Sequence, residues 1–93
     1  MKAIWKNTVL AESAETKVVE GNHYFPPQAV AHQYLTESET HTRCGWKGIA
    51  SYYDVRVNGD TLPDAAWYYP DCKAEAKHIE GYVAFSRQID LSD

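Results

Sequence analysis

The amino-acid sequence predicts one small domain that is mainly β. Ninety-three residues are few for two domains, and a chain of this size buries roughly two-thirds of its unfolded surface in one core. About seven short apolar or alternating segments are separated by tight-turn signals, of which Asn58-Gly59 is the strongest. Strands do not alternate with helices, which excludes a doubly wound sheet. Residues 1–93 are therefore expected to form a single domain with one or two short helices.

The composition excludes several partners. The net charge is −4, with 9 basic and 13 acidic residues, so the chain lacks the basic face that nucleic acid needs. No apolar run approaches the roughly 20 residues of a membrane span, and no signal peptide follows Met1. We expect a cytoplasmic protein that binds neither nucleic acid nor membrane. Cys44 and Cys72 are then expected to be free thiols.

The N-terminal segments predict strands joined by tight turns. Residues 2–5 and 8–11 carry apolar side chains on either side of Lys6-Asn7, which predicts a hairpin. Residues 16–20 predict a third strand that stops at Gly21-Asn22.

A short helix is predicted next. Pro27 fits the first turn of a helix, and apolar residues recur at helical spacing to Leu35, so we expect two turns over 27–35. Residues 36–39 carry no apolar side chain and predict an exposed loop.

The central stretch predicts strand, turn, strand. Residues 40–44 and 49–57 flank Gly45-Trp46-Lys47-Gly48. Strand alternation places Val55 and Val57 inward and puts Tyr52 on the polar face.

The C-terminal part predicts an aromatic strand, a helix and a closing strand. The aromatic strand covers residues 65–69, with Trp67 and Tyr69 on one face. Asp71 is expected to cap a short helix that ends at Ile79, and residues 82–89 form the last strand.

Arg43, Cys44 and Lys47 concentrate reactive chemistry in five residues. A turn bracketed by glycines can hold an anion with the Lys47 ammonium and backbone N–H groups. Nearby cations favour the thiolate of an exposed Cys44. His41 is three residues from Cys44 and points to the opposite strand face, which argues against a Cys-His dyad. The alternative is that both cations are simply solvated and Cys44 is a small core residue.

No metal is expected. The chain has two Cys and four His but no Cys-x2-Cys or His-x3-His pair that would nucleate a zinc site. The carboxylates of Glu37, Glu39 and Asp54 are expected to be solvated. The cofactor, if any, is not indicated by the sequence.

Four motifs together resemble a known family. They are Tyr24-Phe25-Pro26, Cys44 to Tyr52, Ala65 to Pro70, and Val83-Ala84-Phe85. In this order and spacing the chain resembles the small bacterial domain of unknown function 427 family, sometimes labelled nucleotidyltransferase-like. The resemblance implies a β-tent-like fold of two small antiparallel sheets, similar in shape to methionine sulfoxide reductase B and Mss4 domains. No Asp-x-Asp or Gly-Ser pair of a nucleotidyltransferase occurs, so we do not expect that activity.

Three functions follow from these residues. The first is a pocket around the Cys-x-x-Lys-Gly hairpin that binds a small anionic or aromatic ligand. In it Lys47 and neighbouring Arg43 meet the anion, Tyr52 and Tyr69 donate hydrogen bonds, and Trp67 forms a wall.

The second is an enzyme that uses Cys44 as a nucleophile or redox thiol. The third is a protein interaction module with an exposed sheet edge or aromatic patch.

Overall fold

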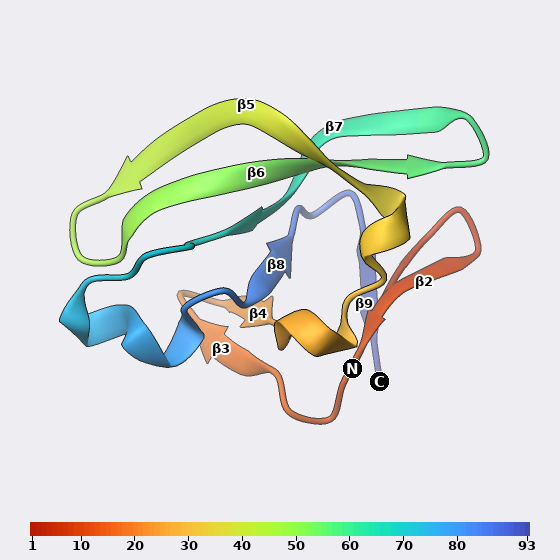
Figure 1. Cartoon of the computed structure of the whole chain (residues 1–93). Coiled ribbons are helices and arrows are strands. Elements are labelled where there is room, and N and C mark those ends of the chain that lie inside the picture. The colour runs from red at the N-terminus through yellow and green to blue at the C-terminus, as the bar shows by residue number, and fades with distance from the viewer.

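The computed structural model describes all 93 residues and has a mainly β fold, as predicted. Its strands form three antiparallel sheets rather than the two expected, with the orders β2-β1-β9, β3-β4 and β5-β6-β7-β8 (Figure 1). The strands are β1 (Lys2–Trp5), β2 (Thr8–Glu12), β3 (Lys17–Val19), β4 (Asn22–Tyr24), β5 (Leu35–Cys44), β6 (Gly48–Val57), β7 (Asp60–Tyr68), β8 (Val83–Phe85) and β9 (Asp90–Ser92).

The helical segments are short 3₁₀ turns, η1 (Pro27–Ala29), η2 (His32–Tyr34) and η3 (Ala74–Ile79). None of them has the length and apolar character that crossing a membrane requires.

The predicted tight turns are present. Lys6 and Asn7 both have positive φ between β1 and β2, and Asn58 and Gly59 do so between β6 and β7, as type I′ hairpin turns require. The closing strand predicted over 82–89 is shorter than expected, because β8 covers only Val83–Phe85 and a separate strand, β9, follows at Asp90–Ser92. Strand β9 then pairs with β1, which brings the two termini together (Figure 1).

The helix predicted over 27–35 is wrong. Val30 is extended between η1 and η2 and bridges to Ala11, and the Ala31 N–H donates to the Leu10 carbonyl at 2.7 Å. Pairing with β2 thus replaces the i to i−4 bonds of an α-helix.

The exposed loop predicted over 36–39 is also wrong, because this segment belongs to β5. A strand at the edge of a sheet needs backbone partners but no apolar side chains. Its polar side chains are used instead: Ser38 and Thr40 donate to the Asp64 carboxylate at 2.6 and 2.8 Å.

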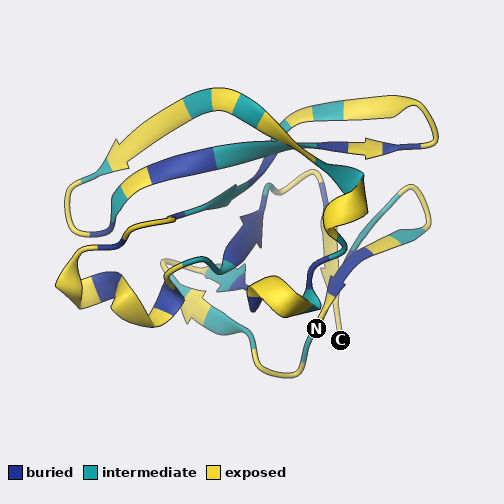
Figure 2. Cartoon of the chain, in the orientation of Figure 1, coloured by how far each residue is buried: buried dark blue, intermediate teal, exposed yellow.

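The core has two parts. The larger cluster includes Phe25 and Phe85, whose rings meet edge to face with centroids 5.7 Å apart, and Val55 and Val57 as predicted. The smaller cluster lies beneath the end of the β5–β6 hairpin and is built from Tyr24, Ala50, Tyr69, Cys72, Ala76, Ile79 and Ala84. Both clusters meet at the central strands, and Figure 2 shows all of β8 and part of β6 as buried.

Strand alternation separates the aromatic residues as the sequence predicts, and the clusters show where each side goes. Trp67 and Tyr69 pack with the smaller cluster and Tyr68 with the larger one. Tyr52 is not on a polar face: it packs on the smaller cluster, because a β-bulge between Tyr53 and Val55 changes the alternation along β6.

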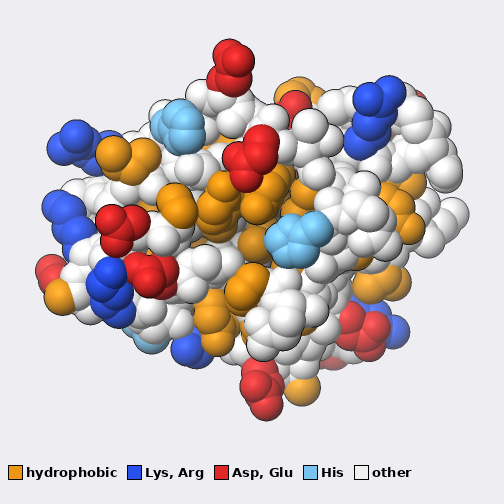
Figure 3. Space-filling view, viewed as in Figure 1, with side chains coloured by type: hydrophobic (Ala, Val, Ile, Leu, Met, Phe, Trp, Pro, Cys, Tyr) orange, Lys and Arg blue, Asp and Glu red, His pale blue; other side chains and the backbone are white.

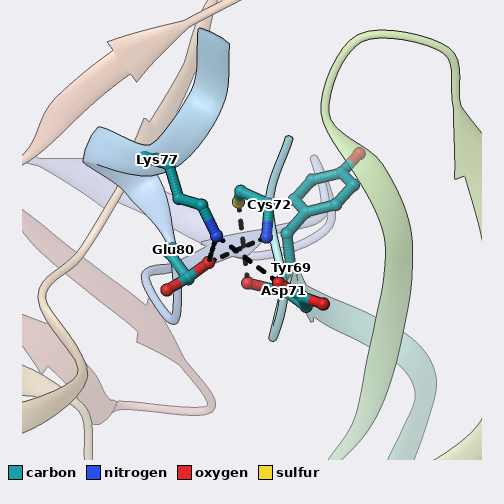
Figure 4. A network of polar contacts seen from close by, with 5 residues as sticks. All are labelled: Tyr69, Asp71, Cys72, Lys77 and Glu80. Atoms are coloured by element: carbon teal, nitrogen blue, oxygen red, sulfur yellow. Dashed lines mark hydrogen bonds and ion pairs between the residues drawn. The ribbon is translucent and has the colours of Figure 1, made fainter. Parts of the chain in front are cut away.

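The segment after β7 is held by a polar network that Figure 4 shows. The Glu80 carboxylate accepts from the Cys72 N–H at 2.9 Å and from the Lys77 ammonium at 2.8 Å. The predicted cap is wrong, since η3 begins after Lys73 without any side-chain cap and Asp71 lies outside it. The network holds the two ends of this segment together.

Gly48 permits a close approach in this region. It has a φ of +123°, and a Cβ built on it would lie 2.9 Å from the Asp71 carbonyl oxygen. Gly45, in the same turn, has nothing within 4 Å of such a Cβ.

Gly48→Ala is therefore expected to lower the free energy of unfolding by about 1–3 kcal/mol, through backbone strain and displacement of the Asp71 peptide. Urea unfolding followed by tryptophan fluorescence measures this, with Gly45→Ala as the matched control. Equal stability of the two variants would contradict the close approach.

Candidate functional site

The two faces at the end of the β5–β6 hairpin carry different side chains. Arg43 pairs with Ile49 and His41 with Ser51, so all four lie on one face of the sheet. Cys44 lies on the other face, packed against the smaller core cluster. This agrees with the predicted separation of His41 from Cys44.

On the inner face, Lys47 is ion-paired rather than free. Its side chain is 5% exposed, and the ammonium binds the carboxylate of Glu20. The same ammonium lies 5.0 Å from the Trp46 ring centroid and 5.4 Å from that of Tyr69. A cation between two aromatic faces and a carboxylate is stabilised in place.

The pair changes the ionisation of both partners. Burial alone would lower the pKa of Lys47, but the hydrogen bond to Glu20 and the charge interactions with Tyr24, Tyr69 and Cys44 together raise it. The hydrogen bond from Lys47 lowers the pKa of the Glu20 carboxyl. The pair is therefore charged at neutral pH.

Sequence reasoning missed Glu20. The available signal was its place in the turn between β3 and β4, where Glu20 and Gly21 both have positive φ.

The predicted aromatic residues do come together, as packed side chains. The Trp67 Nε1–H donates to the Tyr24 hydroxyl at 3.1 Å, and the rings of Trp67 and Tyr52 are 6.3 Å apart. Burial raises the pKa of Tyr69 to about 12. With Lys47, these residues form a wall behind the hairpin.

The two thiols differ in character. Burial opposes ionisation of Cys44, but the Trp46 and Lys47 N–H groups and the Lys47 ammonium together lower its pKa. Burial raises the pKa of Cys72, whose thiol lies 3.8 Å from the Tyr69 carbonyl oxygen. Both are free, as predicted.

Two adjoining hollows, of about 410 and 240 Å³, lie beside the end of the β5–β6 hairpin, mainly against its outer face, and we call them the hairpin groove. They share Gly48, Ile49 and Lys73. The larger is also lined by His41, Ser51, Pro70, Asp71 and Cys72, and the smaller by Arg43 and Cys44.

The groove forms because the chain after β7 returns to β6. Gly48 bridges to Cys72, and the Lys73 N–H donates to the Lys47 carbonyl at 3.0 Å. The Lys73 ammonium then donates to the Gly45 carbonyl at 2.6 Å. No local motif in the sequence predicts that Gly45 and Lys73, which are 28 positions apart, meet here.

Of the predicted site residues, the groove contains Arg43 and Cys44. Lys47, Tyr52, Trp67 and Tyr69 line neither hollow. No three His, Cys, Asp or Glu side chains gather at one place in the fold.

A family model described as a domain of unknown function (DUF427) matches residues 1–92. The chain belongs to this family. The match confirms the resemblance that the four sequence motifs indicate, and it covers almost the whole chain. No curated protein matches this DUF427 chain.

Removing the charge of Glu20 and removing the charge of Lys47 are expected to lower the stability of the fold by different amounts. Glu20→Gln leaves a buried ammonium without its countercharge, whereas Lys47→Met removes the charge and keeps the apolar stem. The freed Glu20 carboxylate in the second variant is hydrated, since its side chain is 52% exposed. Glu20→Gln is therefore expected to lower the urea midpoint more than Lys47→Met, and the reverse order would refute the buried pair.

The same pair predicts a pH dependence. Because the pKa of Glu20 is lowered in the folded state, the unfolded chain binds this proton first as the pH falls. The stabilisation is present above the ordinary carboxyl value of 4.5 and is lost as the pH falls through the lowered value. The difference in urea midpoint between wild type and Glu20→Gln should shrink on acidification, and a pH-independent difference would count against this account.

Proposed function

We propose that this DUF427 domain binds a small anionic ligand in the hairpin groove. The observation that carries the proposal is the set of basic groups that line it, Arg43, Lys73 and His41. The Arg43 side chain is exposed and has no ion-pair partner in the fold, so its fork of N–H donors is available to a carboxylate or phosphate. Lys73 uses one of its three donors on the Gly45 carbonyl and keeps two.

The charge around the groove favours an anion. The chain as a whole carries −4, and basic and acidic side chains are interspersed at the left of Figure 3, but the groove lining itself carries Arg43, Lys73 and His41 against one carboxylate. Asp71 is the one carboxylate in the lining, and its Oδ1 lies 3.4 Å from the Lys77 ammonium, which it shares with Glu80 (Figure 4). A local basic site on an acidic protein attracts anions selectively to that place.

Apolar lining favours an organic anion over an inorganic ion. Ile49 is 51% exposed and faces the groove together with Pro70. A pocket with apolar walls and a few charged groups fixes a small molecule by burying its carbon skeleton and pairing its charge. Lys47 supports the hairpin from the opposite face, and Arg43 and Lys73 meet the ligand.

Arg43→Ala or Lys73→Ala is expected to weaken anion binding about tenfold each, because each removes a charge-assisted hydrogen bond. The probes are inorganic phosphate and succinate, titrated at constant ionic strength and followed by isothermal calorimetry or NMR. Higher salt should weaken binding to the wild-type protein as well.

The matched control is Arg56→Ala, which removes the same charge from an exposed position near the other end of β6. It should leave binding unchanged. Equal losses in Arg56→Ala and Arg43→Ala would mean that the whole surface, rather than the groove, attracts the anion.

The second candidate function is chemistry at Cys44, as a nucleophile or redox thiol. The observation that favours it is the lowered pKa of Cys44 beside the Trp46 and Lys47 N–H groups, at the edge of the groove. The thiolate is the reactive form of cysteine, so a lowered pKa increases the reactive fraction at neutral pH.

Cys44 is expected to react with iodoacetamide faster than Cys72 at neutral pH, with its rate rising at a pH below that of an ordinary thiol. Mass spectrometry of the modified peptides separates the two sites. Cys44→Ser should remove the fast phase and Cys72→Ser should keep it. A Cys44 that reacts no faster than Cys72 would falsify this second candidate.

A further inference from the structure

The larger hollow contains a hydrogen-bonded pair in addition to Lys73. Ser51 Oγ is 3.3 Å from His41 Nδ1, and Ser51 is 8% exposed although its hydroxyl group is polar. The two residues are a cross-strand pair, and both line the groove.

This pair offers one hydrogen-bond donor to a ligand in either arrangement of its protons. If the Ser51 hydroxyl donates to Nδ1, the imidazole proton is on Nε2, which is then available to donate. If Nδ1 carries the proton and donates to Ser51, the Ser51 hydroxyl is free to donate. The acceptor that satisfies this donor must come from solvent or from a bound molecule.

The β-ladder sets the distance between the two parts of the groove. Arg43 and Ile49 form one rung, and His41 and Ser51 form another, two residues along each strand and on the same face. Two residues of strand span roughly 7 Å. Arg43, in the smaller hollow, and the Ser51–His41 pair, in the larger one, are therefore separated by about the length of a short organic molecule. Ile49 and Lys73 line both hollows.

We infer that the ligand is an elongated organic anion with two acceptor groups, one at Arg43 and Lys73 and the other at Ser51 and His41. This inference rests on the proposed function and specifies its ligand class. Linear dicarboxylates are the simplest members, with the carbon chain lying along Ile49. The spacing of the rungs favours adipate or pimelate over malonate.

The test titrates malonate, succinate, glutarate, adipate and pimelate into the full chain at constant ionic strength, each beside the monocarboxylate of equal chain length. Affinity for the dicarboxylates should peak at a carboxylate separation near the roughly 7 Å of the two rungs. At the peak, the second carboxylate should strengthen binding about tenfold over the matched monocarboxylate.

The double variant Ser51→Ala/His41→Ala removes both donors of the pair and should abolish that gain, whereas each single variant keeps one donor. Monocarboxylate binding should be retained through Arg43 and Lys73. Thr42→Ala is the control, because Thr42 follows His41 on β5 and bonds the Tyr52 hydroxyl on the opposite face, 2.9 Å away. It should keep the gain. Heat-induced unfolding of each variant confirms that it is folded before titration.

The outcomes separate this inference from the proposed function. If monocarboxylates bind through Arg43 but dicarboxylates of every length bind no better, the inference is wrong and the proposed function stands. If the double variant Ser51→Ala/His41→Ala keeps the full gain, the second group lies elsewhere and the inference is also wrong. If neither carboxylates nor phosphate bind, both fail.

Discussion

The contact between Gly48 and the chain that follows β7 organises this end of the molecule. Because Gly48 has no Cβ, its backbone reaches the Asp71 carbonyl and bridges to Cys72. That contact brings Lys73 to the same hollow as Arg43, and it pairs the start of β6 with the chain that follows Pro70. The hairpin then has one face in the core and one face open, so packing and ligand contact are assigned to different side chains.

The ion pair between Lys47 and Glu20 follows from this division of faces. A lysine in a glycine-bracketed turn is ordinarily solvated, but this one points inward between two aromatic rings. Such burial requires a countercharge, which Glu20 supplies from a turn 27 positions earlier in the sequence. The rings of Trp46 and Tyr69 flank the ammonium, which leaves the Lys47 side chain only 5% exposed.

The sequence predicted what local chemistry determines. Paired positive-φ positions such as Asn58-Gly59 and strand parity at Trp67 and Tyr69 were confirmed, since both depend on neighbours in the chain. The 27–35 helix failed because Val30 pairs with Ala11, and the inward role of Lys47 was missed because Glu20 is distant in sequence. The groove could not be predicted for the same reason: Arg43 was identified, but Lys73 joins it only through tertiary pairing.

The central claim is that the open face of the hairpin, and not the aromatic face, meets the ligand. Amide chemical-shift mapping during titration with phosphate tests it most directly. Saturable shifts are expected at the groove residues His41, Arg43, Ile49, Ser51 and Lys73. Shifts that centre on Glu20, Trp46 and Trp67, or that never saturate, would contradict it.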